Sequence, residues 1–312
     1  MAFERSRAVL GRMGFPAVTI DAPAATPHIV DTLIAERGHR LVNHPAWPLV
    51  RPLLHRVLHY REAVRMADEV ARLSGLEGLD YMSGLLRLSL SVRGTGRIPR
   101  SGGFVLALNH PTGIADGIAV YDAIKSVRRD LAIFTNRDAI RVNRRFADIL
   151  IPVEWRAEFK STAKARETLV GTQRAVAEER AIVIFPSGRI AYWNEGELTE
   201  RPWQSSVVAL ARRYNCPVIP VNIQARNSGL FYFLSQFSTD LRDITVFHEL
   251  LNKTGRAYRI TVGKPVPAAA LDGDAVAVAA QLQSHTVKAL AADPGADFME
   301  SQSRAPDVSR AR

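Results

Sequence analysis

A histidine and an aspartate lie close together in the stretch 109–116, Asn-His-Pro-Thr-Gly-Ile-Ala-Asp, and could share the work of moving a proton. The run before it, 103–108, is short and mostly apolar, which predicts a buried strand. The run after it, 117–126, is rich in Ala and Ile and predicts a helix that has Asp116 at or near its N-terminus. A carboxylate there is favoured by the helix dipole and can hydrogen-bond one imidazole nitrogen of His110. The other nitrogen is then free to accept a proton, so the pair suits general-base activation of a hydroxyl or an amine.

Three further short blocks each lie at the end of a strand-like apolar run. They are 134–137 (Phe-Thr-Asn-Arg), 184–189 (Ile-Phe-Pro-Ser-Gly-Arg) and 216–221 (Cys-Pro-Val-Ile-Pro-Val). Together with 109–116, and in this order, they resemble the four motif blocks of the glycerolipid (lysophospholipid) acyltransferase family, of the 1-acylglycerol-3-phosphate acyltransferase type. In that family the first block is Asn-His followed by Asp, the second carries an Arg, the third is Phe-Pro-Glu-Gly, and the fourth is a strand similar to Val-Pro-Val. The resemblance covers about residues 85–265.

The resemblance implies an acyltransferase that moves a fatty acyl group from acyl-CoA or acyl-carrier protein to a lysolipid, in phospholipid or aminolipid biosynthesis. A thioester donor is already activated, so no cofactor, no metal and no covalent intermediate are expected. His110 is then the general base and Asp116 its orienting partner. Arg137 of the second block and Arg189 are the cations expected to bind a phosphate or carboxylate of the acceptor through bidentate contacts. The other residues expected to shape the substrate site are Asn109, Gly113, Pro186, Ser187 and Gly188.

Two positions depart from the family pattern. Five residues separate His110 from Asp116 where the family has four, and Gly113 supplies the backbone freedom that absorbs the extra residue. Ser187 stands where the third block of the family has Glu, which removes a carboxylate from the acceptor site. The acceptor therefore stays open among lysophosphatidate, another lysophospholipid, and a lyso-aminolipid such as lyso-ornithine lipid.

Other chemistries lack their motifs in this chain. No Gly-x-Ser-x-Gly elbow is present, and the His-Glu pair at 248–249 has no second histidine at zincin spacing. The run 94–99 begins like a dinucleotide-binding loop, but it has Pro in place of the third Gly and precedes a strand. No Gly-Lys-Ser/Thr phosphate loop occurs. One rival from another class stays open, a basic peripheral membrane protein that has an acyltransferase-like fold but no turnover.

The charge of the chain limits its partners. Its 41 Lys and Arg residues against 31 Asp and Glu residues give a formal net charge of +10. Such a charge favours a membrane surface with anionic lipids, or an acidic carrier protein, as a partner. Nucleic acid is not expected as a partner, because the sequence has no basic stripe interleaved with aromatic residues, no zinc-finger spacing and no recognition-helix pattern.

Cysteine content and hydropathy predict the compartment. Cys216 is the single cysteine, so no disulfide framework is possible and a reducing compartment is expected. Residues 1–11 lack the apolar core of a signal peptide, and no window of about 18 apolar residues predicts a spanning helix. We therefore expect a cytoplasmic protein that binds peripherally to the inner face of the cell membrane.

Apolar periodicity divides the chain into three regions. An N-terminal helical region is expected over 1–86, with residues 1–24 loosely ordered, then an acyltransferase α/β domain over 87–293 and a disordered tail over 294–312. Within the second region strands and helices alternate, which predicts an α/β fold with a mostly parallel sheet flanked by helices and an N-terminal helical extension. The strands are expected at 88–92, 104–108, 131–134, 149–153, 181–185, 218–223 and 258–262, and longer helices at 137–147, 162–179 and 203–214. The first three motif blocks follow strands directly, so they can converge at the carboxyl ends of a parallel sheet.

The N-terminal helical region contains a basic amphipathic stretch over 48–73. Its segment 53–64 has an apolar stripe flanked by arginines at 51, 56, 61 and 65. Such a stretch either lies on a bilayer surface or packs its stripe onto the core of the protein. Both interpretations stay open.

Overall fold

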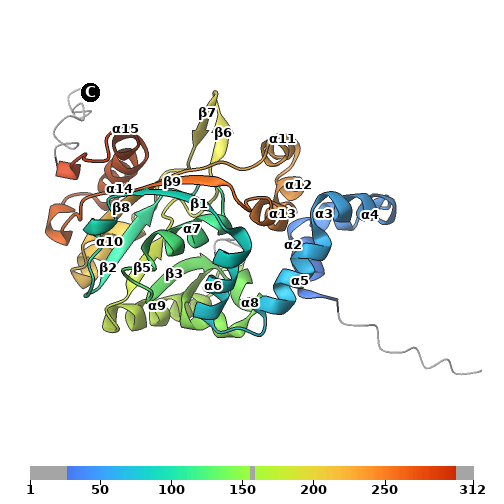
Figure 1. Ribbon diagram of the computed structural model, residues 1–312, viewed down its shortest axis with the longest axis horizontal. Helices are drawn as coiled ribbons and strands as arrows, with labels where there is room; N and C mark the ends of the chain where they lie inside the picture. Colours follow the sequence, from blue (N-terminus) through green and yellow to red (C-terminus); the bar gives the residue numbers. More distant parts are fainter. Residues whose placement is uncertain (1–26, 155–158, 300–312) are drawn as a thin grey trace, which may run out of the picture.

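A seven-stranded sheet runs through the centre of the molecule (Figure 1). The computed structural model describes residues 27–154 and 159–299. The strand order is β1-β9-β8-β2-β5-β3-β4, and every neighbouring pair is parallel except β8 and β9. The strands are β1 (Ser89–Arg93), β2 (Phe104–Leu108), β3 (Leu131–Asn136), β4 (Leu150–Val153), β5 (Ala181–Ile184), β8 (Val218–Gln224) and β9 (Ala257–Val262). The predicted α/β class and mostly parallel sheet are confirmed.

The central strands are apolar along their whole length because both faces of the sheet are covered. β2 and β5 are buried at every position, as expected for parallel strands between two helical layers. Alternate residues of β2 face opposite layers: Phe104 and Leu106 belong to one hydrophobic cluster and Val105 and Ala107 to the other. Each of the seven predicted strand runs begins within one residue of an observed strand, because such runs are local and strongly apolar.

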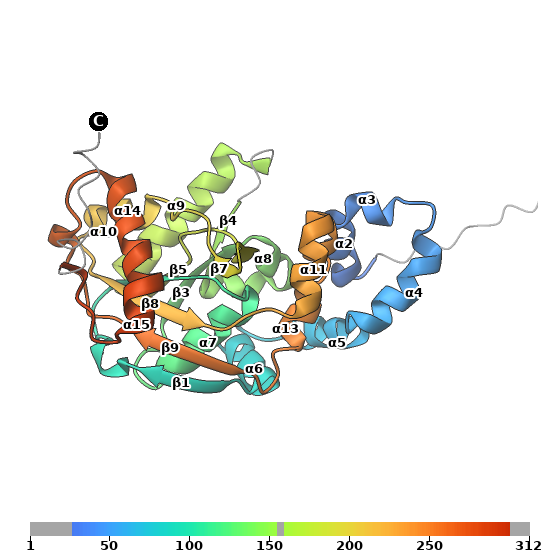
Figure 2. The ribbon, with the colours of Figure 1, turned by 90° about the horizontal axis from the view of Figure 1, so that it is seen from above.

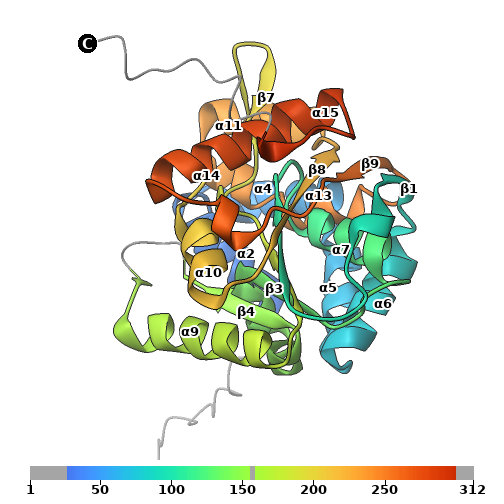
Figure 3. The same cartoon turned by 90° about the vertical axis from the view of Figure 1, so that its left-hand side faces the viewer.

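Helices cover the sheet from two sides (Figure 3). One layer contains α6 (Gly75–Leu86) and α7 (Ile114–Ile124). The opposite layer contains α9 (Thr162–Ala177), α10 (Ser206–Tyr214) and α14 (Ala275–Ser284). The longest helix, α9, has 16 residues, and in the described part of the chain no helix combines the length and the apolar character needed to cross a bilayer.

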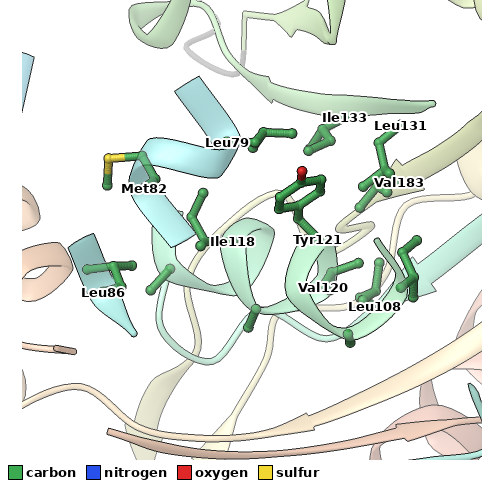
Figure 4. Packing of buried hydrophobic residues seen from close by; sticks show 14 of the residues in the cluster. Leu79, Met82, Leu86, Leu108, Ile118, Val120, Tyr121, Leu131, Ile133 and Val183 are labelled. Atoms are coloured by element: carbon green, nitrogen blue, oxygen red, sulfur yellow. The ribbon is translucent and has the colours of Figure 1, made fainter. Parts of the chain in front are cut away.

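The helix α7 packs between α6 and the sheet (Figure 4). Tyr121 is fully buried in this interface, and its hydroxyl donates to the Asp80 carboxylate of α6. The apolar side chains that surround it come from three sources, α6 (Leu79, Met82, Leu86), α7 (Ile118, Val120) and the sheet (Leu108, Leu131, Ile133, Val183). This packing fixes the orientation of α7, whose first turn carries Asp116.

The N-terminal helices lie beside a second group of helices that follows β8 (Figure 2). The first group is α2 (Ile29–Arg37), α3 (His39–Val42), α4 (Trp47–Val57) and α5 (Tyr60–Val70); the second is α11 (Gly229–Phe237), α12 (Thr239–Asp243) and α13 (Val246–Leu251). Buried side chains of α2 and α5 belong to the same hydrophobic cluster as the sheet. The predicted helical extension therefore shares one core with the α/β part through α2 and α5, whereas α3 and α4 have no buried residue.

One predicted helix and one hairpin differ from the sequence-based expectation. The helix expected at 137–147 is interrupted at Asn143, between α8 (Asp138–Val142) and the 3-10 turn η2 (Arg144–Asp148). The Asn143 side chain donates to the carbonyls of Val70 and Leu73, so a tertiary contact ends the helix. The short hairpin of β6 (Tyr192–Asn194) and β7 (Glu197–Thr199) was not predicted, and it projects from the molecule just after the third motif block (Figure 1).

The C-terminal segment is ordered as far as the structure describes it. A π-helical turn (His285–Ala289) and α15 (Leu290–Ala292) follow α14, and Phe298 then packs edge-on against the His285 ring, with 5.5 Å between ring centroids. Phe298 is 2% exposed, so the predicted disorder from 294 onward is wrong for 294–299. The predictions for residues 300–312 and 1–26 lie outside the described residues. Two further 3-10 turns are at Thr95–Arg97 and Ala268–Ala270.

Replacing Phe298 by Ala is expected to lower the free energy of unfolding by about 3 kcal/mol, because a buried aromatic ring leaves a cavity behind. The neighbouring Met299 is 52% exposed, so Met299→Ala should change that free energy by less than about 0.5 kcal/mol. Urea denaturation of both variants measures the difference. Equal stability of the two variants would show that this segment contributes nothing to the core.

Candidate active site

The structure brings His110 and Asp116 together at the carboxyl end of β2. His110 is the second residue after the strand, and Asp116 is the third residue of α7. His110 Nδ1 lies 2.9 Å from Asp116 Oδ2. The Asp116 side chain is completely buried, whereas the His110 ring keeps some exposure. The pair therefore has an inward carboxylate and an outward imidazole.

Four groups surround the Asp116 carboxylate. The backbone N–H groups of Thr112 and Gly113 donate to Oδ2 at 2.8 and 3.0 Å, and the Thr112 hydroxyl donates to Oδ1. The fourth is His110 Nδ1, which must carry the hydrogen because an ionised carboxylate only accepts. Nε2 then holds the lone pair of the ring, and within residues 27–154 and 159–299 it has no hydrogen-bond partner. Nε2 is the basic atom that the site offers.

Gly113 makes the tight turn of this loop possible. Its φ of +92° lies in a region that other residues rarely adopt. A Cβ at this position would also lie 2.8 Å from Ile190 Cδ1. With the backbone turned in this way, the N–H groups of Thr112 and Gly113 point at Asp116 and are not available to a substrate oxyanion.

Asn109 joins the ends of two neighbouring strands. Its Nδ2 donates to the Ile223 carbonyl at 2.8 Å, and its Oδ1 accepts from the Ile223 N–H at 2.6 Å. The buried side chain thereby continues the pairing of β2 with β8 beyond the last residue of β2. Asn109 fixes the direction in which His110 leaves the sheet.

The third motif block packs directly on His110. The Phe185 ring lies against the imidazole, with 4.3 Å between centroids. Ser187 is buried and its hydroxyl donates to the Arg189 carbonyl at 3.0 Å. The Pro186 carbonyl accepts from the Gln204 N–H at 3.0 Å. Gly188 and Arg189 are exposed in the same loop, so this block forms one wall beside the base.

Arg137 lies farther along the sheet, at the end of β3, which is separated from β2 by β5. Its Nη2 is 2.7 Å from the Glu167 carboxylate of α9. The contact is an ion pair rather than an aligned hydrogen bond, since Nε and Nη2 are buried and have no hydrogen-bond partner among the described residues. The guanidinium therefore keeps unused donors that an anion could accept from.

No motif in the sequence indicates that Tyr258 and Glu200 belong to this site. Tyr258 of β9 contacts the Thr112 hydroxyl at 2.9 Å and so supports the Asp116 network from another strand. Glu200, which follows the β6–β7 hairpin, accepts from the His110 backbone N–H. Burial raises the pKa of Glu200, while hydrogen bonds from Trp203 and His110 oppose that rise. Only the fold brings these side chains to the base.

No metal site is evident in the part of the chain that the structure describes. No group of three or more His, Cys, Asp or Glu side chains has the geometry to hold an ion there. The expectation of a cofactor-free reaction stays a prediction.

The sequence of the sheet region matches a known family. A sequence model of the Acyltransferase family matches residues 89–224, from the start of β1 to the end of β8. The segment 89–224 is therefore similar to the acyltransferase domain of that family. The resemblance predicted from the four motif blocks is thereby confirmed, and all four blocks lie inside the matched segment of this domain.

Two similar proteins with curated names are lyso-glycine lipid O-acyltransferases. That of Phocaeicola vulgatus is 23% identical over 221 residues, covering 69% of this chain and 77% of the relative. That of Bacteroides thetaiotaomicron is 20% identical over 220 residues, covering 69% of this chain and 79% of the relative. A crystal structure of the 1-acyl-sn-glycerophosphate (LPA) acyltransferase PlsC from Thermotoga maritima superposes with a TM-score of 0.46 and 11% identity, covering 83% of this chain and 97% of that one.

Proposed function

We propose that this protein transfers a fatty acyl group from a thioester donor to the hydroxyl of a lysolipid, with His110 as the general base. The observation that carries the proposal is the His110–Asp116 pair inside the segment that matches the Acyltransferase family. Its Nε2 atom lies at the carboxyl end of β2 and has no hydrogen-bond partner among the described residues. Sites in parallel α/β sheets lie at this end of the strands. The rival, a membrane protein with this fold but no turnover, would not need an oriented base.

The proposed chemistry has two proton steps and no covalent enzyme intermediate. Nε2 of His110 takes the hydroxyl proton of the acceptor as its oxygen attacks the thioester carbonyl carbon. The carbon–sulfur bond then breaks, and the imidazolium returns the proton to the departing thiolate. Asp116 stabilises the imidazolium and holds the ring in the Nδ1–H form. A general base of this kind contributes about 10²–10⁴-fold to the rate.

The acceptor is proposed to be a lyso-aminolipid with an acidic headgroup. The two relatives are named for a lyso-glycine lipid, and Ser187 stands where the family pattern has Glu. The proposed cations for that headgroup are Arg137, whose Nε and Nη2 have no hydrogen-bond partner in the described part of the chain, and Arg189, in the loop beside His110. The donor is a fatty acyl thioester, acyl-CoA or acyl-carrier protein.

Purified protein is expected to acylate lyso-glycine lipid faster than lysophosphatidate, and parallel assays with acyl-CoA and acyl-carrier protein identify the donor. His110→Ala should lower kcat by about 10²–10⁴-fold, and Asp116→Asn should also lower it strongly because the imidazole loses its orienting anion. His44→Ala, at an exposed histidine, is the matched control. Absence of transfer to any lysolipid from either donor would refute the enzyme proposal. Near-normal rates in Asp116→Asn would refute the role of Asp116.

Arg137→Ala is expected to raise the KM for the anionic acceptor more than the KM for the thioester. Arg137→Lys should restore the acceptor KM only in part, because lysine keeps the charge but lacks the planar guanidinium that makes bidentate contacts. Glu167→Gln removes the ion-pair partner but keeps the guanidinium. If Arg137 binds the acceptor, the Glu167→Gln control should keep the acceptor KM near that of the wild type. Steady-state kinetics with each substrate varied in turn make the comparison. Equal effects of both variants, or equal effects on both substrates, would assign Arg137 a structural role only.

Attachment to a membrane through α4 is the second part of the proposal. Of the predicted amphipathic stretch, α5 buries its apolar side in the core through Ala63, Met66, Ala67 and Val70. In contrast, Leu49 and Leu53 of α4 are 84% and 65% exposed, and exposed arginines flank them at 51, 56 and 61. An apolar helix face bordered by cations fits an anionic bilayer surface. Phe233 and Phe237 of α11 are further exposed apolar side chains.

The double variant Leu49→Asp/Leu53→Asp is expected to sediment less with anionic vesicles, because it removes the apolar anchor and adds repulsive charge. Arg56→Glu/Arg61→Glu should make the remaining binding weaker and more easily released by salt. The matched control is Leu169→Asp/Val170→Asp on α9, whose two side chains are also exposed. Unchanged sedimentation of the α4 variant, or an equal loss in the control, would exclude α4 as the anchor.

A further inference from the structure

The carboxyl group of Glu200 lies against the backbone of His110, although Glu200 belongs to none of the motif blocks. Its Oε1 accepts from the His110 N–H, and its Oε2 accepts from Trp203 Nε1 at 3.0 Å. We propose that Glu200 is a positioning residue for His110 and takes the place, in this chain, of the carboxylate that the family pattern has at position 187. This inference rests on the proposed function, since it gives Glu200 a part in the action of His110.

Positions 187 and 200 face the same point of the site. The Ser187 hydroxyl lies 3.5 Å from Glu200 Oε1, and Ser187 is buried. A longer acidic side chain at position 187 would enter the space that the Glu200 carboxyl group fills. At the His110 backbone N–H the chain therefore supplies a carboxylate from position 200 and not from position 187.

The β6–β7 hairpin explains how a distant residue reaches this point. Glu195 and Gly196 both have positive φ, of 48° and 83°, which is typical of the tight two-residue turn that joins antiparallel strands. The hairpin returns the chain to its base, where Ala191 precedes β6 and Glu200 follows β7. The Ala191 N–H donates to the His110 carbonyl at 2.9 Å, while Glu200 binds the His110 N–H. Both backbone groups of His110 are thus held by the two ends of one hairpin.

The charged groups of the site also act on the Glu200 carboxyl group. The ionisable groups that face it are His110 and Asp116, and Trp203 and Ser187 are its neutral neighbours. Burial raises the pKa of Glu200, and the His110 charge opposes that rise. The Asp116 charge acts in the opposite sense and adds to the rise. Glu200 is therefore a buried carboxyl group placed between the two members of the His110–Asp116 pair and Trp203.

The test compares Glu200→Ala, Glu200→Gln and the double variant Ser187→Glu/Glu200→Ala with the wild type. Glu197→Ala, at an exposed position of β7, is the matched control. Glu200→Ala should lower kcat by about ten- to a hundredfold with little change in either KM, since misplacement of a reacting group costs up to about 10²-fold. The double variant should recover most of that loss. Glu200→Gln keeps an oxygen that can accept from the His110 N–H, so it should lose less kcat than Glu200→Ala.

A kcat of Glu200→Ala within twofold of the wild type, or a double variant no more active than Glu200→Ala, would overturn the inference. If Glu200→Ala does not fold, Glu200→Gln and Ser187→Glu/Glu200→Gln replace it in the same comparison. The NMR chemical shift of the His110 backbone amide separates this inference from the proposed function, because Glu200 accepts a hydrogen bond from that N–H. The shift should change in Glu200→Ala and Glu200→Gln even if the wild type transfers no acyl group to any lysolipid offered, and an unchanged shift would count against Glu200.

Discussion

The need to satisfy the fully buried carboxylate of Asp116 constrains the whole site. A buried charge without partners would cost several kcal/mol, and here two backbone N–H groups, one hydroxyl and one imidazole N–H meet it. These partners dictate the positive φ of Gly113 and the tight loop between β2 and α7. They also select the Nδ1–H form of His110. The basic nitrogen faces outward because the buried charge faces inward.

The elements that carry this loop are rigid. β2 lies between β8 and β5 in the middle of the sheet, and α7 is clamped between α6 and the strands. Asn109 ties the end of β2 to Ile223, and Tyr258 supports Thr112 from β9. Catalytic groups that must keep their geometry within fractions of an ångström are best placed on such packed elements. The loop that holds His110 is therefore short, and hydrogen bonds tie it to β8, β9 and the first turn of α7.

The parts of the chain with exposed apolar side chains differ from this rigid centre. α4 has no buried residue, while its neighbour α5 contributes four side chains to the core. The aromatic residues of the β6–β7 hairpin and α11 approach one another, with 5.8 Å between the Trp193 and Tyr232 rings. An enzyme whose acceptor resides in a bilayer needs a surface that tolerates lipid beside a site that excludes water, and this distribution of exposed and buried apolar groups is consistent with that need.

The sequence alone determined whatever depends on neighbours in the chain. The seven strands follow from short apolar runs, and the pairing of His110 with Asp116 follows from a turn between a strand and a helix. Tertiary structure decided what depends on residues far apart. Asn143 ends a helix because it binds the carbonyls of Val70 and Leu73, and Phe298 orders a segment whose composition resembles a disordered tail. Glu200 meets His110 only because a hairpin folds the chain back. Periodicity records which face of an element is apolar, but it carries no information about which distant side chain will fill a given space.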